Sequence, residues 1–142
     1  MASSRAYDDV SVGQALPRHV VRLTRGDLIN FAGVSGDSNP IHWHDDLARL
    51  AGLPDVVAHG MLTMGIGGGY ITDWLGDPGA IKEYKVRFTS FVCVGAQQAA
   101  EIEYSAKVTS MDPDTRTAVI AIDTKFQGKR IFGRANVTVQ LT

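Results

Sequence analysis

A short loop segment concentrates the residues of this sequence that are able to move protons. Asp37 and His42 form a close carboxylate–imidazole pair among glycine and proline residues, and Asn39 lies between them. An imidazole titrates near neutrality, and a neighbouring carboxylate can fix its tautomer or share its protons. The segment therefore has the composition of an acid–base dyad, with Asn39 as an orienting amide.

Two other interpretations of this segment stay open. Asp37 and Asn39 could bond only their own backbone, in an Asx-turn ahead of the proline. Alternatively, Asp37, His42, His44 and His59 offer four potential metal ligands, but a His-x-His pair without a third ligand at defined spacing is a weak zinc signal. The D-x-N start also fails as a calcium loop, because its sixth position is His42 and not glycine. We therefore predict no metal site.

A second candidate feature, Ala58-His59-Gly60-Met61, comes just before a long apolar stretch. A helix start leaves free N–H groups and the positive end of the helix dipole. Gly60 would let a ligand oxygen approach the main chain closely, as an oxyanion site requires. The flanking His59 and Met61 are candidate substrate contacts. An ordinary glycine at the entry to a buried helix explains the same residues equally well.

Glycine is concentrated in the helix that this start would open, at Gly65, Gly67, Gly68 and Gly69. Each glycine costs about 1 kcal/mol relative to alanine in a helix interior. The dinucleotide pattern G-x-G-x-x-G fails here because its last position is Tyr70. The remaining physical reason is space, since absent side chains let another backbone, helix or ligand chain pass close to the axis.

Periodicity predicts three helices in the first half of the chain. Thr24 is a candidate N-cap with Asp27 in the first turn. Asp45 or Asp46 is expected to cap a second, short helix. The third helix is predicted over Met61–Leu75, where a turn with both glycine and proline follows.

From residue 81 the apolar period changes to two, which is typical of half-buried strands. Strands are predicted over Tyr84–Phe88, continuing towards Val94, then over 101–108, Thr117–Phe126 and 131–141. Short turns between them imply antiparallel pairing, and the apolar helix is expected to cover one sheet face. The fold class is therefore α+β, with an antiparallel sheet wrapped around one helix in a single domain of residues 1–142.

Composition excludes several classes of protein. The chain has 142 residues, a net charge of −1 and one cysteine. Such a charge gives no overall attraction to nucleic acid, and one cysteine excludes an internal disulfide. That residue, Cys93, lies in an apolar run and is expected to be a core thiol. Val56–Leu75 is too broken by glycines to span a membrane, and Met1–Asp9 lack the apolar stretch of a secretory leader, so we expect a cytoplasmic protein.

The two polar segments together resemble a known family. Gly36–His42, followed by His59-Gly60-Met61, is similar to the signature of the MaoC-like, R-specific enoyl hydratase/dehydratase family. The resemblance extends over nearly the whole chain. Further stretches resemble most closely the branch that dehydrates (3R)-hydroxyacyl carrier-protein thioesters in mycobacterial fatty-acid elongation; they are His59–Tyr70, Gly76–Ala80, Val86–Phe88 and Lys129–Arg134.

This resemblance implies a hotdog fold and a hydro-lyase that acts without a cofactor. The implied reaction is the reversible loss of water from a (3R)-3-hydroxyacyl thioester, in fatty-acid elongation with mycolic-acid synthesis included. Asp37 and His42 would be catalytic, Asn39 would orient them, and the Gly60 N–H would receive the thioester oxygen. The expected substrate contacts are His59, Met61, Gly65 and Gly68, although some relatives carry a serine where Gly68 stands.

The resemblance also implies partners. The substrate would be an acyl-ACP or acyl-CoA thioester, and a second hotdog subunit would complete a homodimer or heterodimer. Two alternatives remain open. One is a hotdog subunit that binds acyl chains or stabilises a partner without turnover, and the other is a hotdog thioesterase, which would release free thiol.

Overall fold

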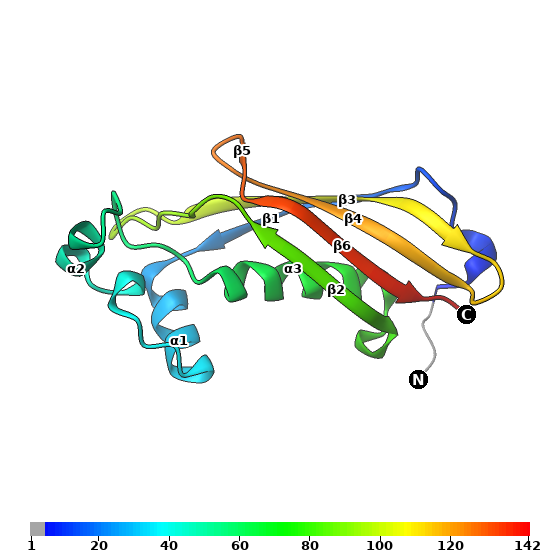
Figure 1. The fold of residues 1–142 in the computed structure, drawn as a ribbon, viewed down its shortest axis with the longest axis horizontal. Coiled ribbons are helices and arrows are strands. Elements are labelled where there is room, and N and C mark those ends of the chain that lie inside the picture. Colours follow the sequence, from blue (N-terminus) through cyan, green and yellow to red (C-terminus); the bar gives the residue numbers. More distant parts are fainter. Residues whose placement is uncertain (1–4) are drawn as a thin grey trace.

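The computed structural model describes residues 5–142 as one antiparallel sheet curled over a central helix (Figure 1). Met1–Ser4, the start of the segment tested for a leader, lie outside the described residues. The α-helices are α1 (Arg25–Ser35), α2 (Asp45–Leu50) and α3 (Gly60–Leu75), and 3₁₀ helices lie at Tyr7–Asp9, Pro40–His42 and Pro78–Ala80. The strands are β1 (Ala15–Leu23), β2 (Ile81–Phe88), β3 (Ala100–Asp112), β4 (Thr117–Phe126), β5 (Lys129–Arg130) and β6 (Phe132–Gln140).

Side chains cap the starts of α1 and α2, although the cap of α2 is not a predicted one. At α1 the Thr24 side chain accepts from the Asp27 N–H, and the Asp27 side chain accepts in return from the Thr24 N–H, as predicted. The prediction that Asp45 or Asp46 caps α2 is wrong. His44 is the N-cap, and its ring accepts from the Leu47 N–H at 3.4 Å. One of the two candidate carboxylates, that of Asp45, is instead engaged by an arginine of α1.

The strands after residue 81 were predicted more accurately than their pairing. The hairpin β3–β4 forms as expected, and β4 covers the predicted range. The predicted continuation of β2 towards Val94 is wrong, because β2 ends at Phe88 and the Val94 N–H bonds to the Val56 carbonyl. Strand β2 pairs with β6 and not with β3. Strand β1 had no prediction, because most of its residues are exposed and no clean alternation marks it.

The sheet order is β1-β3-β4-β6-β2, and all pairs are antiparallel. Helix α3 runs beneath the sheet, while α1 and α2 lie at the end where α3 begins (Figure 1). The buried side chains of α3 belong to a core that includes Ile102, Tyr104, Ile120 and Val137 of the sheet. The α+β prediction is therefore confirmed. No helix within residues 5–142 has the length and apolar character that a membrane crossing needs.

The glycines of α3 have two different environments, and this gives a stability prediction. An added Cβ would meet nothing within 4 Å at Gly69, but at Gly67 it would lie 2.5 Å from the Tyr84 Oη. Gly69→Ala is therefore expected to raise the free energy of unfolding by about 0.5–1 kcal/mol. Gly67→Ala gains the same propensity but displaces a packed ring, and we expect a net loss of about 1–2 kcal/mol. Urea unfolding of both variants checks the opposite signs, and equal effects would contradict the assignment.

Candidate active site

Asp37 and His42 meet at the end of the molecule where α3 begins. Asp37 follows the left-handed Gly36 that ends α1, and His42 ends the short 3₁₀ helix. The His42 Nε2 lies 3.7 Å from the Asp37 Oδ2, and the side chains are 9% and 52% exposed. This separation exceeds a hydrogen bond, but catalytic pairs without substrate are often longer than in their complexes. The predicted pair is therefore brought together, with its carboxylate open to solvent.

The Asx-turn interpretation is also correct, and it does not compete with the pair. The Asn39 N–H donates to the Asp37 Oδ1 at 3.2 Å, and the Asn39 Oδ1 accepts from the Ile41 N–H at 3.3 Å. One carboxylate oxygen therefore fixes the loop while the other faces His42. Asn39 orients Asp37 through the backbone and does not itself bond the imidazole.

The neutral form of His42 has a defined tautomer. Its Nδ1 lies 2.7 Å from the Val57 carbonyl oxygen, which can only accept, so Nδ1 carries the proton. Nε2 is then the unprotonated nitrogen, and it is the one that faces Asp37. The arrangement presents a base and a carboxylate side by side, able to share protons with a bound substrate.

His59 lies directly against His42, with its ring stacked at 3.7 Å between centroids. It is 1% exposed, and its Nε2 donates to the Asp37 carbonyl oxygen at 3.2 Å. Its Nδ1 is buried without a partner among the described residues. Phe31 of α1 contacts the same ring edge-on at 4.8 Å. His59 thus packs against the His42 ring of the pair. It was predicted as a substrate contact, but its side chain is buried in this chain.

Burial gives His59 a pH signature. Loss of hydration lowers its pKa below the ordinary value near 6.5, with the neighbouring His42 adding to the effect. The unfolded chain then binds more protons than the folded chain as pH falls through about 6.5, so folding stability is lost on acidification. We expect His59→Gln to flatten the fall in Tm between about pH 7.5 and pH 5.5. His19→Gln, at an exposed histidine, is the matched control, and the same slope in both variants would contradict this assignment.

Gly60 is the first residue of α3, and the described residues offer no acceptor to its N–H. Gly60 directly follows His59, whose ring stacks on that of His42. The Gly60 N–H and the positive end of the helix dipole therefore lie close to the two stacked imidazole rings. A Cβ at Gly60 would lie 3.2–3.3 Å from three atoms of the Phe88 ring. A larger residue at this position would therefore require the Phe88 ring to move by a few tenths of an ångström. The site can hold a developing negative charge on a ligand oxygen beside two acid–base groups.

Asp37, His42 and His59 also have potential ligand atoms within 4.8 Å of one another. The two imidazole rings are stacked with their planes at 21°, and the His59 Nε2 is already bonded to the Asp37 carbonyl oxygen, so that nitrogen carries a proton and offers no lone pair to an ion. His44, the fourth proposed ligand, is used as the cap of α2.

The other predicted substrate contacts are spread along α3. Met61 is 61% exposed, and Gly65 is exposed with nothing within 4 Å of an added Cβ. Gly68 instead faces the Tyr84 ring, at 3.5 Å from an added Cβ. Met61 and Gly65 therefore lie open in this chain, whereas the space beside Gly68 is filled.

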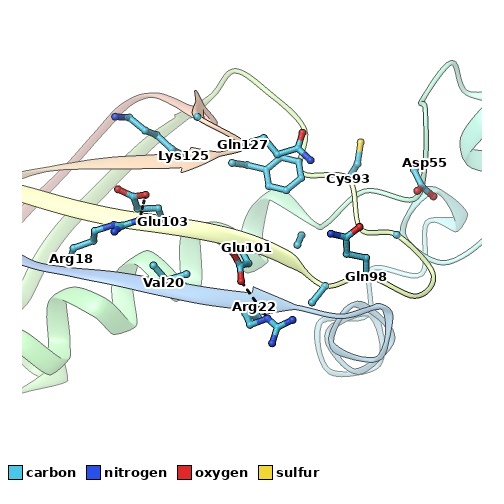
Figure 2. Close-up of a pocket in the computed structure, with 15 residues that line it drawn as sticks. Arg18, Val20, Arg22, Asp55, Cys93, Gln98, Glu101, Glu103, Lys125 and Gln127 are labelled. Carbon is cyan, nitrogen blue, oxygen red and sulfur yellow. Dashed lines mark hydrogen bonds and ion pairs between the residues drawn. The ribbon is translucent and has the colours of Figure 1, made fainter.

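A hollow of about 630 Å³ lies elsewhere, on the solvent side of β1, β3 and β4 (Figure 2). Two ion pairs between β1 and β3 lie on its wall, Arg18 with Glu103 and Arg22 with Glu101. None of the predicted site residues lines it. Cys93 does, half-buried, and burial together with the nearby Asp55 raises the pKa of its thiol. The core-thiol prediction is corrected to a half-buried thiol that is a weak nucleophile at neutral pH.

Sequence reasoning missed one arginine that links the segments around the pair. Arg25, at the start of α1, is 19% exposed and bonds both Asp45 and Asp55, at 2.9 and 2.7 Å, and the Val94 carbonyl. It links α1, α2 and the segment that leads to Val57. No local signal marks it, because its partners lie 20, 30 and 69 positions further along the chain.

Comparison with known proteins assigns residues 10–125 to the family described as MaoC-like domain. The (R)-specific enoyl-CoA hydratase of Rhodospirillum rubrum is 28% identical over 94% of this chain and 90% of its own length. The 3-hydroxyacyl-thioester dehydratase X of Mycobacterium tuberculosis is 47% identical over 47 residues, which are 33% of this chain and 17% of that protein.

A solved structure described as a MaoC-like dehydratase has the same fold, with a TM-score of 0.97 and 51% identity. The match covers 99% of this chain and 44% of the other. This chain therefore spans less than half the length of that relative, and its match to the mycobacterial protein is limited to 17% of that protein.

Proposed function

Because the chain belongs to the MaoC-like domain family, a family of R-specific hydratases and dehydratases with the hotdog fold, we propose that its own site catalyses that chemistry. The proposed reaction is the reversible hydration of a trans-2-enoyl thioester to a (3R)-3-hydroxyacyl thioester. The observation that carries the proposal is the position of Asp37 and the His42 Nε2 at 3.7 Å, beside the free N–H of Gly60.

The geometry suits this reaction step by step. In hydration, the Asp37–His42 pair takes one proton from water while the water oxygen bonds to C3. The electron pair of the double bond moves onto the thioester oxygen, where the Gly60 N–H and the helix dipole stabilise it. The pair then returns a proton to C2, and dehydration is the reverse. Water and substrate supply all atoms of the product, so no cofactor is needed.

The expected substrates are acyl-CoA or acyl-ACP thioesters of fatty-acid elongation, with mycolic-acid synthesis included. We propose residues 1–142 as one hotdog unit that works beside a second, as a homodimer or heterodimer. Two observations support this. The solved relative that fits at a TM-score of 0.97 is more than twice as long, and Met61 and Gly65 are open along α3. A second unit or the acyl chain would cover these positions.

An activity assay tests the proposal. The purified chain is incubated with crotonyl-CoA and longer enoyl thioesters, alone and with candidate partner subunits, while enoyl absorbance, free thiol and the configuration of the product are followed. Loss of enoyl absorbance with an R product is expected. Release of thiol alone would identify a thioesterase, and binding without turnover a subunit that only holds acyl chains. Either result would overturn the hydratase proposal.

A further inference from the structure

Two tyrosines, the partly buried Tyr84 and the fully buried Tyr104, reach from the sheet to one turn of α3. Tyr84 of β2 donates its hydroxyl to the Met64 carbonyl at 2.9 Å, and Tyr104 of β3 donates to the Thr63 carbonyl at 2.8 Å. Since β2 and β3 are not neighbours in the sheet, the two hydroxyls hold the helix from different strands. Burial raises the pKa of both phenols, so each remains a protonated donor near neutral pH.

The glycines of α3 explain how these hydroxyls gain access. In an α-helix the carbonyls of residues 63 and 64 point towards the N–H groups of residues 67 and 68. A Cβ at Gly67 would lie 2.5 Å from the Tyr84 Oη and 3.4 Å from the Tyr104 Cε1, and one at Gly68 would lie 3.5 Å from the Tyr84 Cε1. The phenols therefore occupy the space that the missing side chains leave.

The turn held in this way is the one that follows Gly60. The Thr63 hydroxyl donates to the Gly60 carbonyl at 2.7 Å, and the Phe88 ring packs against Gly60 from the same strand as Tyr84. Three residues of helix place the Thr63 carbonyl about 4.5 Å along the axis from the equivalent point of Gly60. A shift of this turn along the axis would move the Gly60 N–H by a similar distance.

We infer that Tyr84 and Tyr104 are positioning residues, whose hydroxyls fix the axial position of α3 and thereby place the Gly60 N–H relative to Asp37 and His42. The inference rests on the proposed function, in which this N–H receives the thioester oxygen. A donor displaced by about 1 Å stabilises the transition state less, while most contacts to the ground-state substrate are retained. Loss of either hydroxyl should therefore affect kcat more than KM.

Phenylalanine substitutions test this with a matched control. Tyr70 is a buried tyrosine of α3 itself, ten positions after Gly60, and its hydroxyl donates to the Pro17 carbonyl of β1 at 2.8 Å, so it holds the far half of the helix and not the turn that follows Gly60. Tyr84→Phe and Tyr104→Phe are each expected to lower kcat about 10-fold with KM within about 2-fold. Tyr70→Phe should lose a similar amount of Tm and keep the wild-type kcat.

A second readout follows the donor directly. The absorbance of a bound 2,4-dienoyl-CoA shifts to longer wavelength when hydrogen-bond donors polarise its carbonyl. This shift should shrink in Tyr84→Phe and Tyr104→Phe and persist in Tyr70→Phe, and either of the first two variants suffices if the other does not fold. If the wild type hydrates enoyl-CoA but all three variants retain kcat and the shift, the inference is wrong and the proposed function stands. A wild type without hydratase activity would overturn both.

Discussion

Replacing His42 by alanine is expected to lower kcat for enoyl-thioester hydration by about 10²–10⁴-fold, the usual contribution of a positioned acid–base group. The side chain is 9% exposed, and its tautomer is fixed by the Val57 carbonyl, so its unprotonated Nε2 faces Asp37. Stopped-flow or steady-state measurement with crotonyl-CoA gives kcat and KM separately. Thermal unfolding shows whether the variant keeps its fold.

Asp37→Asn tests the other member of the pair with a smaller change in structure. The amide oxygen of asparagine can still accept from the Asn39 N–H, so the turn that holds the loop is retained. What disappears is a carboxylate that takes and returns a proton, and we expect a loss of kcat of similar size to that of His42→Ala. His44→Asn serves as the control, since asparagine is a good N-cap for α2 and His44 lies outside the pair. Full activity in either His42→Ala or Asp37→Asn would contradict the dyad.

Local chemistry made much of this fold predictable. The capping pair Thr24 and Asp27, the apolar run of α3 and the turn between β3 and β4 each depend on neighbours within a few residues. The same holds for the dyad, because the Asx-turn at Asp37 and the 3₁₀ turn that ends at His42 form within one loop. Residue type and spacing therefore predicted that these side chains lie together, whereas the preference for an acid–base pair over a turn came from the family resemblance.

Features that depend on distant parts of the chain were not predictable. The pairing of β2 with β6 joins the first strand after α3 to the last strand along the chain. The tautomer of His42 depends on a carbonyl 15 residues later, and His44 replaces Asp45 as a cap because Arg25 engages that carboxylate. In each case the deciding contact is tertiary, and no short-range pattern records it.

The glycines of α3 illustrate the same limit within one helix. Gly65 and Gly69 face open space, whereas Gly67 and Gly68 admit Tyr84. All four have the same residue type and the same helical environment in sequence, so only the register of β2 against α3 separates them. A single explanation for the whole cluster was therefore too coarse.

Arg25→Met is expected to lower the free energy of unfolding by about 2–3 kcal/mol. The substitution removes a mostly buried guanidinium, and three acceptors then lose their donor. For a domain of this size the loss corresponds to a fall in Tm of about 6–12 °C. Arg25→Lys should recover only part of it, since one ammonium group cannot reproduce the planar fork. Differential scanning calorimetry measures both.

Arg25→Met should also affect catalysis. Arg25 bonds Asp55, and the segment that follows presents the Val57 carbonyl to His42. The Val57 N–H bonds to the Ile41 carbonyl, and the preceding Val56 bonds to Asp55, the carboxylate held by Arg25. A looser segment orients the imidazole less well, and we expect Arg25→Met to lower kcat about 10-fold.

Arg22→Met is the matched control for this prediction. That arginine is 70% exposed and lies 3.6 Å from Glu101, a surface pair whose loss changes stability by about 0.5 kcal/mol or less. Equal stability and equal kcat in the Arg25→Met and Arg22→Met variants would mean that the dyad is held by its own loop alone. A deficit confined to Arg25→Met would place the control of His42 orientation in a residue of α1 that lies 17 positions before it.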